Sequence, residues 1–202
     1  GIAERECVKK RRKNSMKKIM SLFQRNYETD RLVRDEIVHG AEWVTNGEGI
    51  ATRKYDGTCC LILDEKLYKR YEAKKQPPAD FIPAQEQDPI TGHWVGWRPC
   101  HRGEPADKYH WEAFDSEKKE DGTYELLGPK IQGNPEKMER HVLFPHSKAE
   151  ILTDCPRNFY DLKEYLKNKD IEGVVFHHPD GRMVKIKKKD FGMKRGISLT
   201  KT

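Results

Sequence analysis

The fold is decided by residues 54–63, Lys-Tyr-Asp-Gly-Thr-Cys-Cys-Leu-Ile-Leu, in which a tight turn leads directly into a short apolar run. The Asp-Gly pair breaks the chain, and the apolar run over residues 59–63 has the length and composition of a buried strand. Lys54 therefore stands where its amine can reach the mouth of a pocket. An ordinary turn with an exposed lysine is the alternative that these residues leave open.

Further strands are predicted along the chain, together with one helix. Turn residues and apolar runs predict strands over residues 59–63, 67–72, 123–127, 141–144, 171–177 and 183–188. After Pro156, apolar residues recur at helical spacing and predict a helix over residues 156–168. Residues 73–110 are rich in Pro, Gly and Trp, so we expect an ordered surface segment with little regular structure. Together these elements predict an α+β fold of mostly antiparallel sheets with few helices.

The length of the chain suits one domain preceded by a basic arm. Its 202 residues predict an arm or helix over residues 1–30 and a single domain over residues 31–202. The arm contains the cationic block Lys-Lys-Arg-Arg-Lys at residues 9–13, and a weak helical stripe of apolar side chains follows at residues 19–23. A solvated basic tail, an arm that contacts RNA and a nuclear address all fit this pattern.

Composition excludes several classes of protein. With 35% hydrophobic residues the chain can bury a core, which argues against wholesale disorder. No run approaches the roughly 18 apolar residues of a membrane span, so we expect no membrane partner, and the N-terminus carries no secretory stretch. The five cysteines form neither a disulfide framework nor a Cys-x-x-Cys zinc motif. We therefore expect a reducing, intracellular location in the cytoplasm or the nucleus.

Two later strands carry charged residues that suit phosphate chemistry. Glu172 opens an apolar strand, where a glutamate is paired, binds a hard cation such as Mg²⁺, or ends a helix before a turn glycine. In the next strand, alternation places Lys185, Lys187 and Lys189 on one face and apolar residues on the other. Gathered ammonium groups repel one another unless an anion such as phosphate lies among them. A solvated edge strand would also carry lysines.

Some residues are ambiguous on their own. Glu125, inside an apolar strand, can accept a hydrogen bond from a sugar hydroxyl or can be an ordinary strand residue. Trp94 and Trp97 can stack on nucleic-acid bases or belong to the core. The pairs at residues 177–178 and 100–101 have no second ligand pair at suitable spacing, so they are not predicted to bind a metal.

Taken in chain order, these motifs are far more specific than each one alone. Lys-x-Asp-Gly, Glu-Leu-x-Gly, Glu-Gly-Val-Val and Lys-x-Lys resemble motifs I, III, IV and V of the covalent nucleotidyltransferase superfamily, which contains ATP-dependent DNA and RNA ligases and mRNA-capping guanylyltransferases. The glutamate before Gly173 favours ligases over capping enzymes. Residues 54–60, 96–99 and 144–146 are similar to the compact, animal-type ATP-dependent 5′–3′ RNA ligases. The resemblance covers roughly residues 45–192.

The resemblance implies a nucleotidyltransferase (ATP-grasp-like) fold and a reaction in three steps. Lys54 attacks the α-phosphorus of ATP to form lysyl-AMP and release pyrophosphate. The AMP then moves to the 5′-phosphate of RNA, and a 3′-OH displaces it to seal the strand. The implied roles are α-phosphate stabilisation by Lys185 and Lys187, ribose binding by Glu125, stacking on adenine by Phe144 or His146, and Mg²⁺ or Mn²⁺ binding by Glu172 and Asp56.

Two features depart from the wider superfamily. Many ligases carry arginine where this chain has Cys59, so we expect Arg70 on the following strand to meet a phosphate instead. Only 13 residues follow Lys189, so we expect no OB domain. The expected partners are ATP and RNA with 5′-phosphate and 3′-OH ends, and we expect a monomer. A capping guanylyltransferase, a DNA ligase and a non-catalytic RNA-binding protein of the same fold remain the alternatives.

Overall fold

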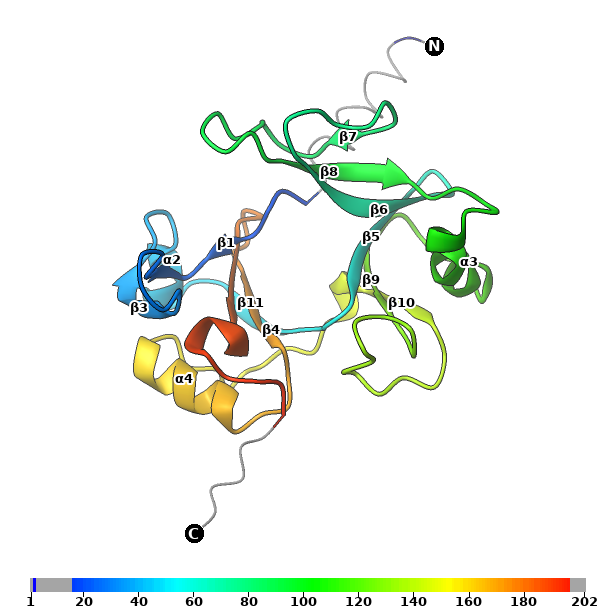
Figure 1. The fold of residues 1–202 in the computed structure, drawn as a ribbon. Helices are drawn as coiled ribbons and strands as arrows, with labels where there is room; N and C mark the ends of the chain where they lie inside the picture. The colour runs from blue at the N-terminus through cyan, green and yellow to red at the C-terminus, as the bar shows by residue number, and fades with distance from the viewer. Residues whose placement is uncertain (1, 3–15, 197–202) are drawn as a thin grey trace. The chain divides into compact units, whose positions relative to one another are not determined.

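The computed structural model describes residue 2 and residues 16–196 of the chain (Figure 1). The described residues form two compact units, one from residues 16–18 and 57–148 and the other from residues 19–56 and 149–196. The chain passes from the second unit to the first between Asp56 and Gly57, inside the motif that begins at Lys54. The cationic block at residues 9–13 lies outside the described residues.

The second unit is built on a four-stranded sheet. Its strands lie in the order β1 (Met20–Ser21), β12 (Met183–Lys187), β11 (Gly173–His177) and β4 (Ile50–Lys54). β11 is antiparallel to both of its neighbours, while β1 runs parallel to β12. A small separate sheet pairs β2 (Phe23–Arg25) with β3 (Val33–Ile37). Lys54 therefore ends the edge strand β4, which pairs directly with β11, the strand that follows Glu172.

One face of this sheet packs on the core of the second unit. Val174, Phe176, Val184 and Ile186 are each at most 1% exposed, as the alternation of side chains in β11 and β12 predicts. The α-helices among the described residues of this unit are α2 (Glu42–Thr45) and α4 (Phe159–Lys167). The amphipathic pattern of α4 buries Leu162 and Leu166 in the same core, where replacing a leucine by alanine costs about 2–5 kcal/mol.

The first unit is built on a six-stranded antiparallel sheet. Its strands lie in the order β10 (Val142–Pro145), β9 (Gly122–Leu127), β5 (Thr58–Leu63), β6 (Lys66–Ala73), β8 (Trp94–Pro99) and β7 (Ile82–Pro83). The helix α3 (Lys108–Asp115) follows the short 3₁₀ helix η1 (Pro105–Asp107) and lies beside β10 (Figure 1). β5 is thus an interior strand, as its apolar run predicts.

Most of the predicted elements are confirmed. The strands predicted over residues 59–63, 67–72, 123–127, 141–144, 171–177 and 183–188 correspond to β5, β6, β9, β10, β11 and β12, and the helix predicted over residues 156–168 corresponds to α4. The α+β class with mostly antiparallel sheets is confirmed as well. The division of the chain between residues 30 and 31 stays a prediction.

Three local predictions are wrong. Residues 73–110 contain β7, β8 and η1. Pro83 does not prevent β7 from forming, because a proline is tolerated in an edge strand. The apolar stripe at residues 19–23 forms strands β1 and β2 rather than a helix, because it pairs with other strands. β12 ends at Lys187, and the 3₁₀ helix η3 (Lys188–Phe191) follows, so Lys189 does not share the lysine face of that strand.

The two tryptophans differ in their surroundings. Trp97 is fully buried against Leu61, Leu63 and Tyr68, so it belongs to the core and does not stack on bases. Trp94 is only partly buried, and its indole nitrogen donates a hydrogen bond to the Gln85 carbonyl at 2.7 Å. Its role therefore stays open.

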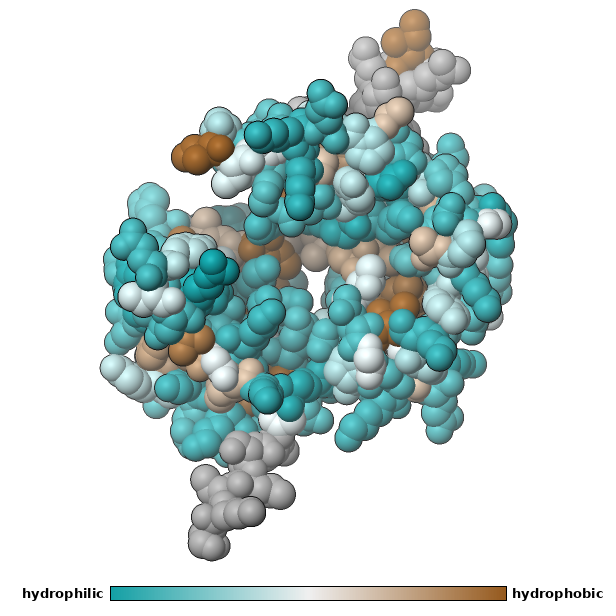
Figure 2. Space-filling model, in the orientation of Figure 1, coloured by the Kyte–Doolittle hydropathy of each residue, from teal (hydrophilic) through white to brown (hydrophobic). Residues whose placement is uncertain are grey.

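The visible surface is mostly polar. Figure 2 shows hydrophilic residues over most of the face that it draws, in keeping with a chain in which 36% of residues are charged. Among the described residues, no helix has both the length and the apolar character that crossing a membrane requires.

Candidate active site

Lys54 and Glu172 form an ion pair in the second unit. Lys54 is the last residue of β4, and Glu172 immediately precedes β11. Lys54 Nζ lies 3.0 Å from Glu172 Oε2, and each side chain is 22% exposed. The pairing of β4 with β11 sets Lys54 opposite Gly173, which brings the two charged side chains to the same end of the sheet. A partly exposed carboxylate thus lies within proton-transfer distance of the motif lysine.

The glycine that follows Glu172, Gly173, is required by the packing of the strands. A Cβ atom at Gly173 would lie 2.3 Å from the Ile186 carbonyl oxygen and 2.8 Å from the Lys187 Cα atom. No side chain fits there without moving the backbone of β12. The Glu-Gly sequence therefore places a carboxylate beside a position where two strands approach closely.

Three lysines of the sequence motifs share one face of the sheet. Lys54 and Lys187 both pair with Gly173, and Lys185 pairs with Val175 two residues further along β11. Residues that pair directly across strands point to the same face, so these lysines lie opposite the buried core face. Neighbouring strands are about 4.8 Å apart, which puts the backbones of Lys54 and Lys187 roughly 10 Å apart, within the reach of two lysine side chains. The prediction that Lys185 and Lys187 share a face is confirmed.

This face also holds a polar pair that the sequence motifs did not indicate. Thr52 Oγ1 lies 3.0 Å from His177 Nε2 and donates to the Val175 carbonyl oxygen at 3.1 Å. Thr52 pairs with Val175, in the same row across the sheet as Lys185. Alternation along residues 50–54 was the available signal, because it puts Thr52 and Lys54 on one face.

Asp56 is tied to the C-terminal part of the second unit. Arg195 Nη1 lies 3.6 Å from Asp56 Oδ2, and Arg195 Nε donates to Asp170 Oδ1 at 2.9 Å. Nearby, Lys188 is buried and its Nζ donates to the Gly196 carbonyl oxygen. Burial lowers the pKa of Lys188, and Asp170 partly opposes that change. Asp56 and Glu172 are thus two partly exposed carboxylates of one unit, 29% and 22% exposed.

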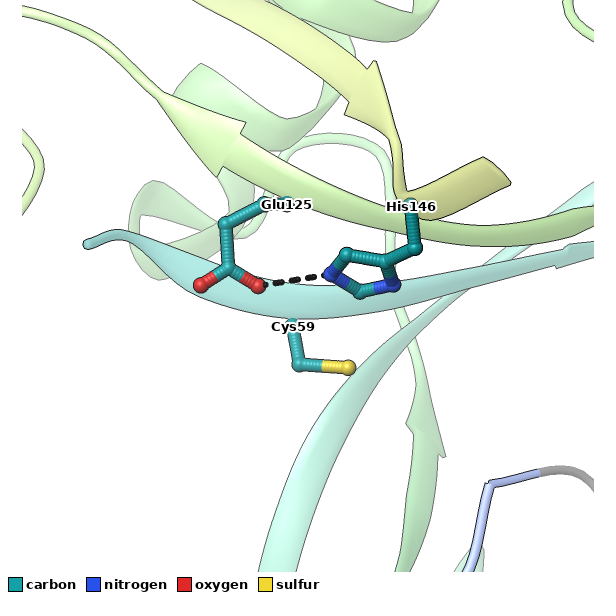
Figure 3. Close-up of side chains that lie close together, drawn as sticks. All are labelled: Cys59, Glu125 and His146. Carbon is teal, nitrogen blue, oxygen red and sulfur yellow. Dashed lines mark hydrogen bonds and ion pairs between the residues drawn. The ribbon is translucent and has the colours of Figure 1, made fainter. Parts of the chain in front are cut away.

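A second group of predicted residues lies in the first unit, around Glu125. This glutamate on β9 is buried, and its neighbours across the sheet are Cys59 on β5 and Phe144 on β10. Glu125 Oε2 accepts a hydrogen bond from the Gly57 backbone at 3.2 Å, and Oε1 lies 3.1 Å from His146 Nε2. Figure 3 shows the side chains of Cys59, Glu125 and His146 converging from different elements.

Gly57 is fixed by the same strand packing. A Cβ atom at this position would lie 2.1 Å from the Leu126 carbonyl oxygen, so no other residue fits without moving β9. The glycine of the Lys-x-Asp-Gly motif therefore lets its own amide reach the Glu125 carboxylate. The Gly57 amide and the Glu125 carboxylate are thus in direct contact within the first unit.

Arg70 lies in the first unit with an unsatisfied donor. Its guanidinium stacks on Trp97, 4.6 Å from the ring centroid, and Nη2 donates to the Met16 carbonyl oxygen. Nη1 is buried and has no hydrogen-bond partner among the described residues. Burial lowers the pKa of this guanidinium, and the neighbouring Cys59 partly opposes that change. A buried donor without a partner costs about 1–3 kcal/mol, which an anionic ligand would recover.

The predicted site residues therefore fall into two sets, each brought together by its own sheet. The second unit holds Lys54, Asp56, Glu172, Lys185 and Lys187, and the first unit holds Arg70, Glu125, Phe144 and His146. Cys59 was noted only as a departure from the superfamily, although it directly faces Glu125. Its place beside Glu125 depends on the register of β5 with β9, which the sequence does not reveal.

Comparisons with known proteins identify the family of this chain. A family model described as RNA ligase 1 matches residues 100–201. The chain is similar to RNA ligase 1 of Danio rerio, with 31% identity over 227 aligned positions that cover 74% of this chain and 69% of the relative. It is similar to RNA ligase 1 of Pongo abelii, with 25% identity over 237 positions that cover 80% and 73%.

A mouse relative gives the same result. RNA ligase 1 of Mus musculus is 24% identical over 219 aligned positions, which cover 71% of this chain and 67% of the relative. The animal-type RNA ligase resemblance drawn from the motifs is thereby confirmed. With half of the chain matched by the family model and two thirds or more of these relatives covered, this chain belongs to the RNA ligase 1 family.

Proposed function

We propose that this chain is an ATP-dependent RNA ligase that joins a 5′-phosphate end to a 3′-OH end of RNA through lysyl-AMP at Lys54. The observation that carries the proposal is the Lys54–Glu172 pair on a sheet face shared with Lys185 and Lys187. The names of the relatives supply the polymer, RNA, and the reaction class, ligation. The nucleotidyltransferase fold itself is part of this proposal.

The first step requires Lys54 to lose a proton. An ammonium cannot attack phosphorus, and an ordinary lysine has a pKa of about 10.4. Lys185 and Lys187 on the same face disfavour a further positive charge, while Glu172 at 3.0 Å favours it. Glu172 also lies within reach to accept the proton. The Lys54 nitrogen then bonds to the α-phosphorus of ATP, and the bond from that phosphorus to pyrophosphate breaks.

For the divalent cation we propose two carboxylates of the second unit as ligands. Asp56 and Glu172 are partly exposed and offer oxygen atoms, which are the donors that Mg²⁺ and Mn²⁺ accept. When bound, Mg²⁺ supplies charge that offsets the negative charge of the phosphates. A Glu172 carboxylate engaged in this way stabilises the Lys54 ammonium less, which favours the neutral amine.

The later steps transfer AMP and then release it. A 5′-phosphate oxygen of RNA attacks the α-phosphorus, the nitrogen–phosphorus bond breaks and Lys54 regains its proton. A 3′-OH then attacks the RNA 5′-phosphorus, AMP leaves and the hydroxyl proton is lost to solvent. Lys185 and Lys187 stabilise the negative charge that develops on phosphate oxygens, a contribution typically worth about 10²–10³ in rate for each donor.

We propose nucleoside-binding roles for residues of the first unit. Glu125, held by the Gly57 amide, accepts a hydrogen bond from a ribose hydroxyl, and Phe144 or His146 covers the adenine. Arg70 offers its unsatisfied Nη1 to a phosphate. The polar groups used in these assignments are the carboxylate of Glu125 and the Nη1 donor of Arg70.

An RNA-joining assay tests the proposal. The full chain is incubated with Mg²⁺, labelled single-stranded or nicked RNA carrying a 5′-phosphate, and either ATP or GTP. The account predicts ATP-dependent joined product with wild type and none with Lys54→Met, while nicked DNA is joined poorly. Product with GTP alone would support a capping-type enzyme, joining of nicked DNA would support a DNA ligase, and RNA binding without product would support a non-catalytic protein.

A further inference from the structure

The side chains of Cys59, Glu125 and His146 form a compact group of three ligand types that bind transition metals. Their ligand atoms, one from each side chain, all lie within 4.8 Å of one another (Figure 3). In tetrahedral zinc sites the ligand atoms stand roughly 3.3–3.6 Å apart, given Zn–S of about 2.3 Å and Zn–N and Zn–O of about 2.0–2.2 Å. Small rotations of the side chains would bring this group to that spacing.

The geometry points to a Zn²⁺ site in which Cys59 Sγ, His146 Nε2 and a Glu125 carboxylate oxygen are the three protein ligands. This inference goes beyond the proposed ligation and does not depend on it. It assigns His146 to the cation, which leaves Phe144 to cover the adenine and Glu125 Oε2 to meet the ribose hydroxyl. A thiolate, an imidazole and a carboxylate are the three ligand types that Zn²⁺ accepts, and a sulfur ligand disfavours Mg²⁺ and Ca²⁺. The two anionic ligands balance the charge of the cation.

The neighbours of His146 orient it as they do in metal sites. His146 Nδ1 lies 2.9 Å from Thr123 Oγ1, while Nε2 points at Glu125 Oε1 at 3.1 Å. The ring satisfies both contacts when the threonine hydroxyl donates to Nδ1 and Nε2–H donates to Glu125 Oε1. In the other tautomer Nδ1 donates to the threonine, and Nε2 then presents a lone pair that a cation can take. Metal-binding histidines characteristically donate their other ring N–H in this way.

The other two ligands are also held in place by the sheet. Glu125 Oε2 accepts from the Gly57 amide at 3.2 Å, which leaves Oε1 toward His146. Cys59 and Glu125 are direct partners across β5 and β9, so their Cβ atoms are about 4.5–5.5 Å apart on one face. Two strands therefore fix two of the three ligands before any cation binds, which lowers the cost of assembling the site.

The surroundings of Cys59 suit a soft metal. Its thiol points to the Met16 thioether, with the two sulfur atoms 3.5 Å apart. The Arg70 guanidinium is close enough to interact electrostatically with Cys59. The His146 side chain is 25% exposed and that of Glu125 is 10% exposed, so solvent reaches one side of the group and leaves a fourth position for water.

Metal titration tests the inference directly. The full chain is stripped with a chelator under reducing conditions and titrated with Zn²⁺ against a chromophoric chelator, and Co²⁺ is used in parallel for its thiolate charge-transfer absorption. Wild type is expected to bind one equivalent of Zn²⁺ and to show the Co²⁺–thiolate band. In Cys59→Ser the band disappears. The affinity for Zn²⁺ falls by more than the ~10–100-fold that is typical when a residue hydrogen-bonded to a metal ligand is removed. Thr123→Val, which removes such a partner, is expected to lose ~10–100-fold.

Cys155→Ser is the matched control, because Cys155 is half-buried in the second unit, where its thiol donates to the Pro156 carbonyl oxygen. It is expected to bind Zn²⁺ as wild type does. Circular dichroism of the metal-free variants checks folding, and His146→Gln replaces Cys59→Ser if the latter unfolds. Retention of affinity and of the thiolate band in Cys59→Ser, or the absence of saturable binding in wild type, would overturn the inference. Zn²⁺ binding is measured without ATP or RNA, so its failure leaves the ligase proposal standing, and a failed ligation assay leaves the metal site standing.

Discussion

Lys54 Nζ lies 3.0 Å from Glu172 Oε2, although 118 residues separate them in the sequence. The antiparallel pairing of β4 with β11 brings them together, and at Gly173 the backbone of β12 approaches so closely that a Cβ atom would not fit. A carboxylate at this distance favours the protonated form of the lysine. The ion pair therefore describes the resting state of the proposed nucleophile.

Glu172→Gln tests whether formation of lysyl-AMP requires the negative charge of this side chain, because the substitution keeps its size. The amide keeps the size of the side chain but neither binds a hard cation well nor accepts a proton. We expect Mg²⁺-dependent formation of lysyl-AMP to slow by at least about 100-fold, with unchanged thermal unfolding. Glu164→Gln on the exposed side of α4 is the matched control and should label as wild type does. Full activity of Glu172→Gln would remove this carboxylate from the mechanism.

Lys187→Met tests the lysine face. Lys187 is the last residue of β12, and its backbone amide donates a hydrogen bond to Asp190 Oδ2 at 2.8 Å. The substitution leaves this backbone hydrogen bond intact. Only the ammonium is lost, so we expect lysyl-AMP formation to fall about 10²–10³-fold while the protein stays folded. Lys163→Met, at an exposed position of α4, controls for the loss of one positive charge. Equal rates for the two variants would show that Lys187 does not act on the phosphates.

The basic block at residues 9–13 is predicted to contribute to RNA binding. It is best tested by substitution, because Leu22 and Phe23 further along the chain are buried in the core of the second unit, and a deletion that removed them would destabilise it. Replacing the five cationic residues by serine should leave lysyl-AMP formation unchanged, weaken RNA binding and reduce its dependence on salt. Filter binding at several salt concentrations measures this, and an unchanged salt slope would exclude the arm from RNA contact.

The burial of His110 leads us to expect a free energy of unfolding that depends on pH. It is 8% exposed, and neither ring nitrogen has a hydrogen-bond partner among the described residues. Burial lowers its pKa and Asp107 partly opposes that change, so the folded protein keeps this histidine neutral where the unfolded chain already binds a proton. The stabilising contribution is thus complete above the unfolded pKa of about 6.5 and is lost as pH falls below it.

His110→Leu isolates this contribution. Between about pH 7.5 and 5.5, wild type should lose up to about 1 kcal/mol more of its free energy of unfolding than the variant does. Urea denaturation at both pH values measures the difference. An identical loss in the two proteins would show that another group governs the acid side of the stability curve.

The elements that were predictable from sequence are those with a strong local pattern. The strand after Glu172 is a continuous apolar run, the strand that ends at Lys187 alternates, and a Pro-Asp-Gly turn joins them. The helix α4 has an apolar stripe and the capping residue Asn158. The predictions for residues 19–23 and 73–110 were wrong because the short strands there form only through pairing with distant segments. Local preference is weak in such segments, and tertiary pairing decides their structure.

The candidate site divides in the same way. Lys54, Glu172, Lys185 and Lys187 were predictable because each lies in a motif whose strand and face follow from nearby residues. The contact of Cys59 with Glu125 and His146 was not, because a shift of one residue in the pairing of β5 with β9 would turn Cys59 to the other face. Register over such sequence distances is a property of the folded sheet.

The most direct test of the central claim is mass spectrometry of the full chain after incubation with ATP and Mg²⁺ in the absence of RNA. The account predicts a mass increase of one AMP, mapped by peptide fragmentation to Lys54 and lost in acid, with no increase in Lys54→Arg. Absence of the adduct, or an AMP found on another residue while Lys54 stays unmodified, would contradict it.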